Sequence, residues 1–193
     1  MKYNTVLLFG APGAGKGTQG KVLGTVPGYF HIACGDVFRN LTVESELGRV
    51  FLEYSGRGEL VPDEYTIRLW REAVEGRKQG AQFQPKRDML VLDGLPRSLT
   101  QAQMLADALN VLAIFNLICP DRSKLIARLQ RRALRENRLD DVNYEVILQR
   151  LDVYERETKP VLDFYGAQLV HTIDATQPPI VVLHQLLEVL TKL

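Results

Sequence analysis

Residues 10–18 read Gly-Ala-Pro-Gly-Ala-Gly-Lys-Gly-Thr, and this stretch decides the fold. An apolar run at residues 5–9 precedes it and a helical pattern at 16–23 follows it, which is the context of a phosphate-binding loop. Glycines let successive backbone N–H groups approach a phosphate, and the helix N-terminus adds its dipole. The lysine supplies a mobile cation for the outer phosphates. We predict a polyphosphate site that includes Gly13, Ala14, Gly15, Lys16, Gly17 and Thr18.

One feature of this loop departs from the strict pattern, in which Ser or Thr follows the lysine directly. Here Gly17 intervenes and Thr18 comes one position later. A hydroxyl ligand for Mg²⁺ is therefore not expected at the usual place. We expect the ion to be held largely through water.

Short apolar runs alternate with longer helical patterns along the rest of the chain. This alternation predicts an α/β fold of the P-loop type: three α/β/α layers around a five-stranded parallel sheet. The expected strands are residues 5–9, 29–32, 89–92, 113–119 and 170–173. The expected helices are 16–23, 36–41, 45–54, 63–75, 99–109, 122–132, 144–165 (with a new turn at Pro160) and 179–190, and 77–87 is expected to be a loop.

Composition favours one globular domain covering residues 1–193. Apolar residues make up 46% of the chain and the formal net charge is +1, so no general attraction to nucleic acid or membrane is implied. Cys34 and Cys119 form no CxxC pair, which argues against a structural zinc site and for a reducing, cytoplasmic setting. No run approaches the ~20 apolar residues of a membrane span.

The loop with its following glutamine, residues 10–19, resembles the opening of the adenylate kinases, and Gly-Thr after the lysine is specific to nucleoside monophosphate kinases. The similarity continues along almost the whole chain. It implies reversible, Mg²⁺-dependent phosphoryl transfer between ATP and AMP, giving two ADP. It also implies a monomer of the short-lid type, with a helical monophosphate-binding segment at 35–64 and a short lid at 131–141.

Three further segments carry the resemblance on the acceptor side. Residues 33–39, 58–63 and 93–97 are similar to the family's Ser-Thr-Gly-Asp-Met-Leu-Arg, Gly-Lys-Leu-Val-x-Asp and Asp-Gly-Phe-Pro-Arg. The match implies that Arg39 and Arg97 bind the acceptor phosphate, for which a planar guanidinium fork is suited, and that Gln101 reads the base. The AMP-binding residues expected from it are Cys34, Gly35, Arg39, Glu59, Leu60, Val61, Gly94, Arg97, Gln101, Arg138 and Arg150.

Two positions in these segments have a second interpretation from the residues alone. Cys34 stands where the family often has threonine, and a thiol is the weaker hydrogen-bond partner for a base; a reactive cysteine is the other interpretation. Asp63 is expected to be a helix N-cap.

Two carboxylates are candidates for holding Mg²⁺. Asp93 ends an apolar strand at the position of a Walker B carboxylate, near Mg²⁺ or its waters, and Asp36 is the second candidate for this role.

Five arginines crowd residues 128–138, at spacings that place several on one helical face. Such a run is often a solvated basic face, but like charges at this spacing repel and a bound polyphosphate would relieve the repulsion. The resemblance places Arg128 near the donor adenine, where the backbone near Gln177 also lies. It implies catalytic roles for Lys16, Arg97, Arg132, Arg138 and Arg150.

No general base is expected. The acceptor is itself a phosphate whose second pKa is about 6, so it is already anionic. None of His31, His171 and His184 lies in a motif that suggests a base. Three alternatives remain: a UMP/CMP kinase, for which asparagine in place of Gln101 is typical, a non-catalytic nucleotide-binding module, and a GTPase switch, which the absence of any Asn-Lys pair disfavours.

Overall fold

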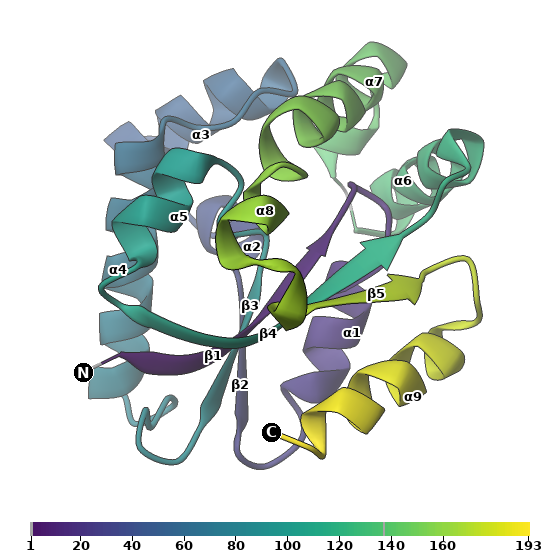
Figure 1. Cartoon of the computed structure of the whole chain (residues 1–193). Coiled ribbons are helices and arrows are strands. Elements are labelled where there is room, and N and C mark those ends of the chain that lie inside the picture. The colour runs from purple at the N-terminus through teal and green to yellow at the C-terminus, as the bar shows by residue number, and fades with distance from the viewer. Residues whose placement is uncertain (1, 137) are drawn as a thin grey trace.

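The computed structural model describes residues 2–136 and 138–193. Within them the chain forms a parallel sheet of five strands in the order β2-β3-β1-β4-β5, with helices on both sides (Figure 1). The predicted fold class is confirmed. The strands are β1 (Tyr3–Gly10), β2 (Tyr29–Ala33), β3 (Met89–Asp93), β4 (Leu109–Ile118) and β5 (Val170–Asp174).

The helices lie between the strands along the chain and differ widely in length. The α-helices are α1 (Lys16–Leu23), α2 (Cys34–Arg39), α3 (Glu46–Gly56), α4 (Asp63–Gln79), α5 (Leu99–Leu105), α6 (Arg122–Glu136), α7 (Tyr144–Val153), α8 (Val161–Tyr165) and α9 (Pro179–Leu190). Shorter turns are the 3₁₀ segments η1 (Leu139–Asp141) and η3 (Ala167–Leu169) and the π-helical η2 (Tyr154–Thr158).

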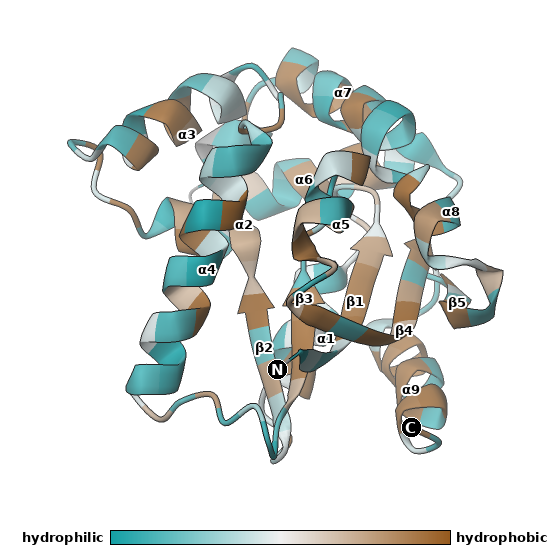
Figure 2. Cartoon of the chain, turned by 60° about the vertical axis from the view of Figure 1, so that its left-hand side comes forward, coloured by the Kyte–Doolittle hydropathy of each residue, from teal (hydrophilic) through white to brown (hydrophobic). Residues whose placement is uncertain are grey.

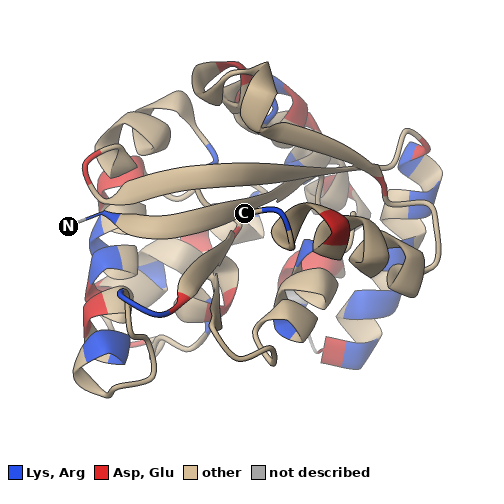
Figure 3. Cartoon of the chain, turned by 60° about the horizontal axis from the view of Figure 1, so that its bottom comes forward, with Lys and Arg blue, Asp and Glu red and all other residues tan. Residues whose placement is uncertain are grey.

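Both faces of the sheet are buried, and alternate residues of each strand serve opposite faces. On β1, Leu7 and Phe9 pack toward α2, α4, α5 and α8, while Val6 and Leu8 pack toward α1, α6 and α9. The strands therefore read as continuous apolar runs. In Figure 2 they are mostly brown, and in Figure 3 the charged residues lie on helices, loops and strand ends.

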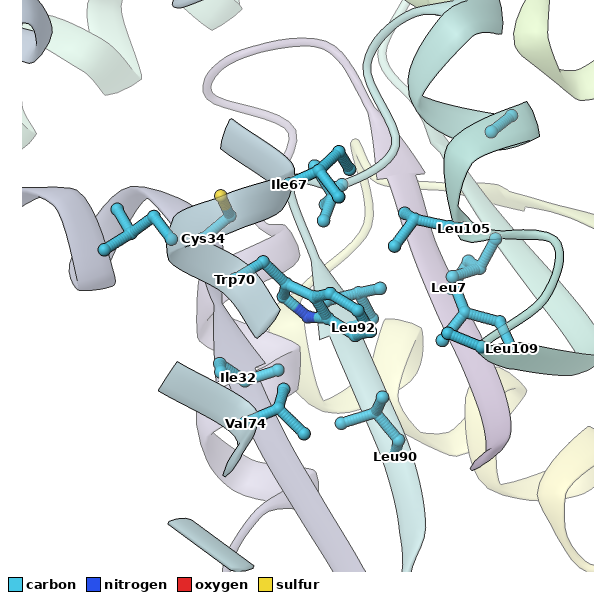
Figure 4. Packing of buried hydrophobic residues seen from close by; sticks show 14 of the residues in the cluster. Leu7, Ile32, Cys34, Ile67, Trp70, Val74, Leu90, Leu92, Leu105 and Leu109 are labelled. Carbon is cyan, nitrogen blue, oxygen red and sulfur yellow. The ribbon is translucent and has the colours of Figure 1, made fainter. Parts of the chain in front are cut away.

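Trp70 of α4 anchors the acceptor-side helices to the sheet. Its side chain is 1% exposed and gathers with Val74, Leu90 and Leu92 between α4 and β3 (Figure 4). Burying an aromatic side chain of this size contributes a few kcal/mol, on the order of 3–5 if it were cut to alanine. The segment that carries α3 and the loop after it is thus attached to a rigid support.

Several expectations about the helices are wrong in detail, and α6, expected to end at 132, runs to Glu136. The helix expected at 99–109 ends at Leu105, because Leu109 begins β4 and pairs with Tyr3. The helix expected at 144–165 is divided by η2, although a new turn does begin after Pro160. α4 runs to Gln79, into the expected loop. Asp63 is the first residue of α4 and Pro62 holds the N-cap position.

The sheet topology positions the site. β1 leads into the glycine-rich loop, β2 into α2, and β3 ends at Asp93, so three carboxyl ends meet at one edge. β1 has β3 on one side and β4 on the other, and ligands of open α/β sheets bind where neighbouring connections diverge in this way.

Candidate active site

A cleft of about 790 Å³ opens at this edge of the sheet. Its walls come from the glycine-rich loop, α2, the loop between α3 and α4, the end of β3, and helices α6 and α7. The structure brings every site residue expected from the sequence to this one cleft. They are Gly13, Ala14, Gly15, Lys16, Gly17, Thr18, Cys34, Gly35, Asp36, Arg39, Glu59, Leu60, Val61, Asp93, Gly94, Arg97, Gln101, Arg128, Arg132, Arg138, Arg150 and Gln177.

The glycine-rich loop has a conformation that other residues rarely adopt. Gly13 has a φ of 84° and Gly15, at the N-cap of α1, a φ of 99°. A Cβ on Gly13 would lie 2.9 Å from the carbonyl oxygen of Leu125, so α6 also packs too closely for a side chain there. Gly15 faces open space, so its backbone angle alone favours glycine.

Lys16 folds back over the loop. Its Nζ donates hydrogen bonds to the carbonyl oxygens of Gly10 at 2.6 Å and of Ala11 at 3.1 Å. Burial lowers the pKa of this ammonium group to about 8, and the nearby charges of Arg97, Arg132 and Arg150 act in the same direction, while Asp93 opposes them. The surroundings of Lys16 thus have an excess of positive charge that an anion would compensate.

Asp93 lies beside the loop and is 8% exposed. A Cβ on Gly17 would lie 3.5 Å from Asp93 Oδ2. The Asp93 carboxylate therefore lies close to the glycine that follows the lysine. Asp36 instead accepts a hydrogen bond from Arg39 and lies 3.6 Å from Arg138. Burial would raise the pKa of Asp36, but its contacts with Arg39 outweigh this and lower it.

These oxygen donors fit Mg²⁺. The ion is usually bound in nucleotide sites by one or two carboxylates, waters and substrate phosphates, and Asp93 and Thr18 both line the cleft. Among the described residues there is no group of three or more His, Cys, Asp or Glu side chains that could hold a metal by themselves. The donor set suits an ion that arrives with a nucleotide.

At α2 and after the end of β3, two arginines lie against glycines. Cβ atoms on Gly35 and Gly94 would approach the guanidinium groups of Arg39 and Arg97 to 3.1 and 2.9 Å. Arg97 Nε also donates to the carbonyl oxygen of Gly94 at 2.8 Å. Next to them, burial raises the pKa of the Cys34 thiol to about 11, so it is not a thiolate at neutral pH and the reactive-cysteine interpretation is disfavoured.

The arginine-rich wall is fixed by two aspartates. Arg132 donates two hydrogen bonds to Asp141, which is completely buried, and Arg150 also bonds to Asp141 and lies 2.8 Å from Asp140. Two other arginines of the run have separate partners. Arg138 donates to Glu136 at 2.8 Å, and Arg128 to the carbonyl oxygen of Ala175 at 2.9 Å.

The sequence does not predict the contacts that three residues make near the site. Asp63 accepts hydrogen bonds from Ser98 and Gln101 instead of capping α4. Thr158 of η2 donates to the carbonyl oxygen of Arg97 at 2.8 Å. His31 Nε2 lies 3.9 Å from Asp93 Oδ2, and its ring occupies the space left by Gly20 of α1. None lies in a motif that gives it this role, because each contact is made across the fold.

A parallel α/β sheet whose first strand leads into a glycine-rich loop and a lysine at a helix N-terminus defines a P-loop nucleotide-binding protein. The family model described as "Adenylate kinase" matches residues 8–170. The chain is 40% identical to the adenylate kinase of Thermobifida fusca over 179 residues, 90% of either chain. It is 41% identical to that of Cyanothece sp. over 180 residues, covering 90% of this chain and 88% of the relative.

The protein therefore belongs to the adenylate kinase family, as the loop sequence predicted. A third relative, the adenylate kinase of Parabacteroides distasonis, is 37% identical over 172 residues. Members of this family transfer a phosphoryl group between ATP and AMP, giving two ADP. In the part of the chain that the structure describes, no helix combines the length and the apolar character needed to cross a membrane.

Proposed function

We propose that this chain catalyses the reversible, Mg²⁺-dependent transfer of the terminal phosphoryl group of ATP to AMP. The observation that supports this most directly is the convergence of cations from separate elements on one cleft. Lys16 comes from the glycine-rich loop and α1, Arg39 from α2, and Arg97 from the segment after β3, and Arg132 and Arg150 line the same cleft. This arrangement suits two phosphorylated ligands that meet end to end.

The donor would lie on the loop and against α6. We assign the loop residues 13–18 to its phosphates, and Arg128 and the backbone near Gln177 to its adenine. The hydrogen bond from Arg128 to Ala175 joins α6 to the segment that carries Gln177. This bond would keep the two proposed adenine contacts, Arg128 and the backbone near Gln177, next to each other.

The acceptor would lie between α2, the segment after α3 and the end of β3. We assign Arg39 and Arg97 to its phosphate, Gln101 to its base, and Cys34, Gly35, Gly94 and residues 59–61 to the surrounding walls. Arg138 and Arg150 would reach the phosphates from the other side. We also propose 35–64 as the monophosphate-binding segment and 131–141 as a short lid.

Catalysis by these residues would be positioning and charge neutralisation, since the acceptor oxygen is already anionic and needs no base. Asp93, with Thr18 and Asp36 nearby, would hold Mg²⁺ through water, and the ion would supply positive charge that offsets the charge of the phosphates. Lys16, Arg132, Arg138 and Arg150 would stabilise the charge on the transferring group. Closure of the two segments would exclude water, the competing acceptor.

The protein would act as a cytoplasmic monomer. The residues expected to bind the two nucleotides line one cleft of one chain, which suits a monomer. Both cysteines are free thiols, which suits a reducing compartment.

A coupled assay of ADP formation with AMP, CMP, UMP and GMP tests the proposal. We expect AMP to have the highest kcat/KM and ATP hydrolysis without any acceptor to be slow. A preference for UMP or CMP would replace the proposal with the pyrimidine kinase, and nucleotide binding without transfer to any acceptor would favour the non-catalytic module.

A further inference from the structure

We propose that Asp63 helps to determine which bases the acceptor site takes, because it fixes the orientation of the Gln101 side-chain amide. The inference rests on the proposed function, in which Gln101 reads the acceptor base. It assigns a specificity role to a residue of α4 that is 38 positions from Gln101 in the sequence.

Both ends of the Gln101 amide are engaged. Its Oε1 accepts a hydrogen bond from the backbone N–H of Arg97 at 2.7 Å, and its Nε2 donates one to Asp63 Oδ1 at 2.8 Å. The side chain lines the cleft yet is 1% exposed, so water offers few alternative partners. Ser98 Oγ donates to the same Asp63 oxygen at 2.9 Å and accepts from the Gln101 backbone N–H at 3.1 Å.

These partners allow only one orientation of the amide. An ionised carboxylate accepts hydrogen bonds and cannot donate them, while a backbone N–H only donates. Rotating the amide of Gln101 by half a turn would place its oxygen against the Asp63 carboxylate and its NH₂ against the Arg97 N–H. Two hydrogen bonds would be lost and two repulsive contacts would form, and one of the lost bonds is the stronger, charge-assisted kind.

A fixed amide presents a fixed pattern to a base. A glutamine side chain has two N–H groups and two acceptor positions, and Asp63 and Arg97 each use one. One donor on the nitrogen and one acceptor on the oxygen remain. Adenine complements them, since its N1 accepts and its N6 amino group donates, and cytosine has the same order on N3 and N4.

Guanine, hypoxanthine and uracil have the reverse order, with a ring N–H that donates beside a carbonyl oxygen that accepts. Binding any of them would require the rotated amide that Asp63 opposes. A site whose polar groups are left unpaired by the wrong ligand rejects that ligand strongly. Asp63 would thus select for bases that carry an amino group at this edge, without touching the base.

The test compares AMP with IMP, which share sugar and phosphate and differ at the base edge. In Asp63→Asn the new amide can donate or accept, so Gln101 can rotate at less cost. We expect the ratio of kcat/KM for AMP to that for IMP to fall at least tenfold, mainly through a lower KM for IMP. Asp63→Ser, whose hydroxyl also donates or accepts, should lower the ratio in the same direction, and thermal unfolding checks that both variants fold.

Ser98→Ala is the matched control, because it removes the other donor to the same Asp63 oxygen, together with the cap on the Gln101 backbone N–H, and leaves both partners of the Gln101 side-chain amide in place. Its AMP-to-IMP ratio should stay within about twofold of the parent ratio. Gln101→Ala tests whether Gln101 reads the base, separately from the role of Asp63. If its ratio collapses while both Asp63 variants keep the parent ratio, the role of Asp63 is overturned although Gln101 still reads the base.

If Gln101→Ala also keeps the parent ratio, the base-reading assignment fails and the role of Asp63 fails with it. Failure of phosphoryl transfer in the unaltered protein would refute the proposed function instead. In that case the same comparison can be made with the dissociation constants of AMP and IMP, measured by calorimetry. An AMP-to-IMP preference in binding that falls in both Asp63 variants would still support the inference.

Discussion

Arg132 holds the carboxylate of Asp141 with two parallel hydrogen bonds, from Nε to Oδ2 at 2.6 Å and from Nη2 to Oδ1 at 3.0 Å. Asp141 is completely buried, whereas Arg132 is partly open to the cleft. The pair therefore joins α6 to the segment before α7 and presents one edge of a guanidinium group toward the proposed phosphates.

Asp141→Asn should be strongly destabilising, because it removes the completely buried anion that Arg132 and Arg150 share and leaves Asp140 as the remaining partner of Arg150. Breaking such a pair costs about 3 kcal/mol of unfolding free energy, and turnover should fall with it because both arginines lose their orientation. Urea unfolding and the coupled assay measure the two effects. Asp152→Asn, in the exposed pair with Arg122, should change stability by less than about 0.5 kcal/mol. Equal effects of the two substitutions would contradict the structural role of Asp141.

Gly58→Ala should destabilise the loop between α3 and α4. Gly58 has a φ of 72°, and a Cβ there would lie 2.8 Å from the carbonyl oxygen of Val146 on α7. We expect a loss of about 1–3 kcal/mol and a higher KM for the acceptor, since residues 59–61 follow directly. Gly56→Ala is the control: nothing lies within 4 Å of its Cβ position, and as the last residue of α3 it should be neutral or stabilising. A Gly58→Ala protein as stable as this control would refute the prediction.

Nucleotide binding should take up a proton at alkaline pH. In the free protein, burial lowers the pKa of Lys16 to about 8. Bound phosphates would favour its ammonium form and raise that pKa. At pH 7 the group is already protonated in both states, so uptake should be near zero there and should grow as pH rises above 8, where affinity should fall. Calorimetry in two buffers of different ionisation enthalpy measures the uptake. An equal proton uptake by Lys16→Met at pH 9 would assign the linkage to another group.

Lys16→Met should lower kcat by about 10²–10³, the loss typical of removing a donor that stabilises transition-state charge, while leaving the fold intact. Circular dichroism and thermal unfolding check the fold. Lys159→Met is the control: it removes an exposed lysine that pairs with Glu155 and should leave kcat unchanged. Near-normal turnover in Lys16→Met would refute the catalytic role proposed for this lysine.

Local patterns were sufficient for the sheet and for the gathering of the site. The strands were predicted from apolar runs because both faces of the sheet are covered, and their carboxyl ends must meet at one edge of a parallel sheet. The boundary after Leu105 was missed for a specific reason. Leu105 and Leu109 are four residues apart, which suits a helix, but the hydrogen bonds of β4 with β1 claim Leu109 for the sheet.

Contacts across the fold could not be predicted in the same way. Asp63 at the start of a helix is an ordinary N-cap candidate, and nothing in its neighbourhood indicates Ser98 or Gln101. His31 is similar: Gly20 leaves room for its ring and Gly24 for its Cβ, yet neither glycine belongs to a motif. These relationships depend on how distant segments pack, which a single sequence does not reveal.

The principal cations of the cleft already have oxygen partners within the protein: Lys16 on loop carbonyls, Arg132 on Asp141, and Arg39 on Asp36. An incoming phosphate therefore exchanges one oxygen neighbour for another and gains less than it would from bare charges. Dissociation of the phosphate is easier for the same reason, because the cationic side chains return to their oxygen partners within the protein. Substrate and product both bind through phosphates, so an enzyme that held either of them too strongly would turn over slowly. The exchange of oxygen partners avoids this.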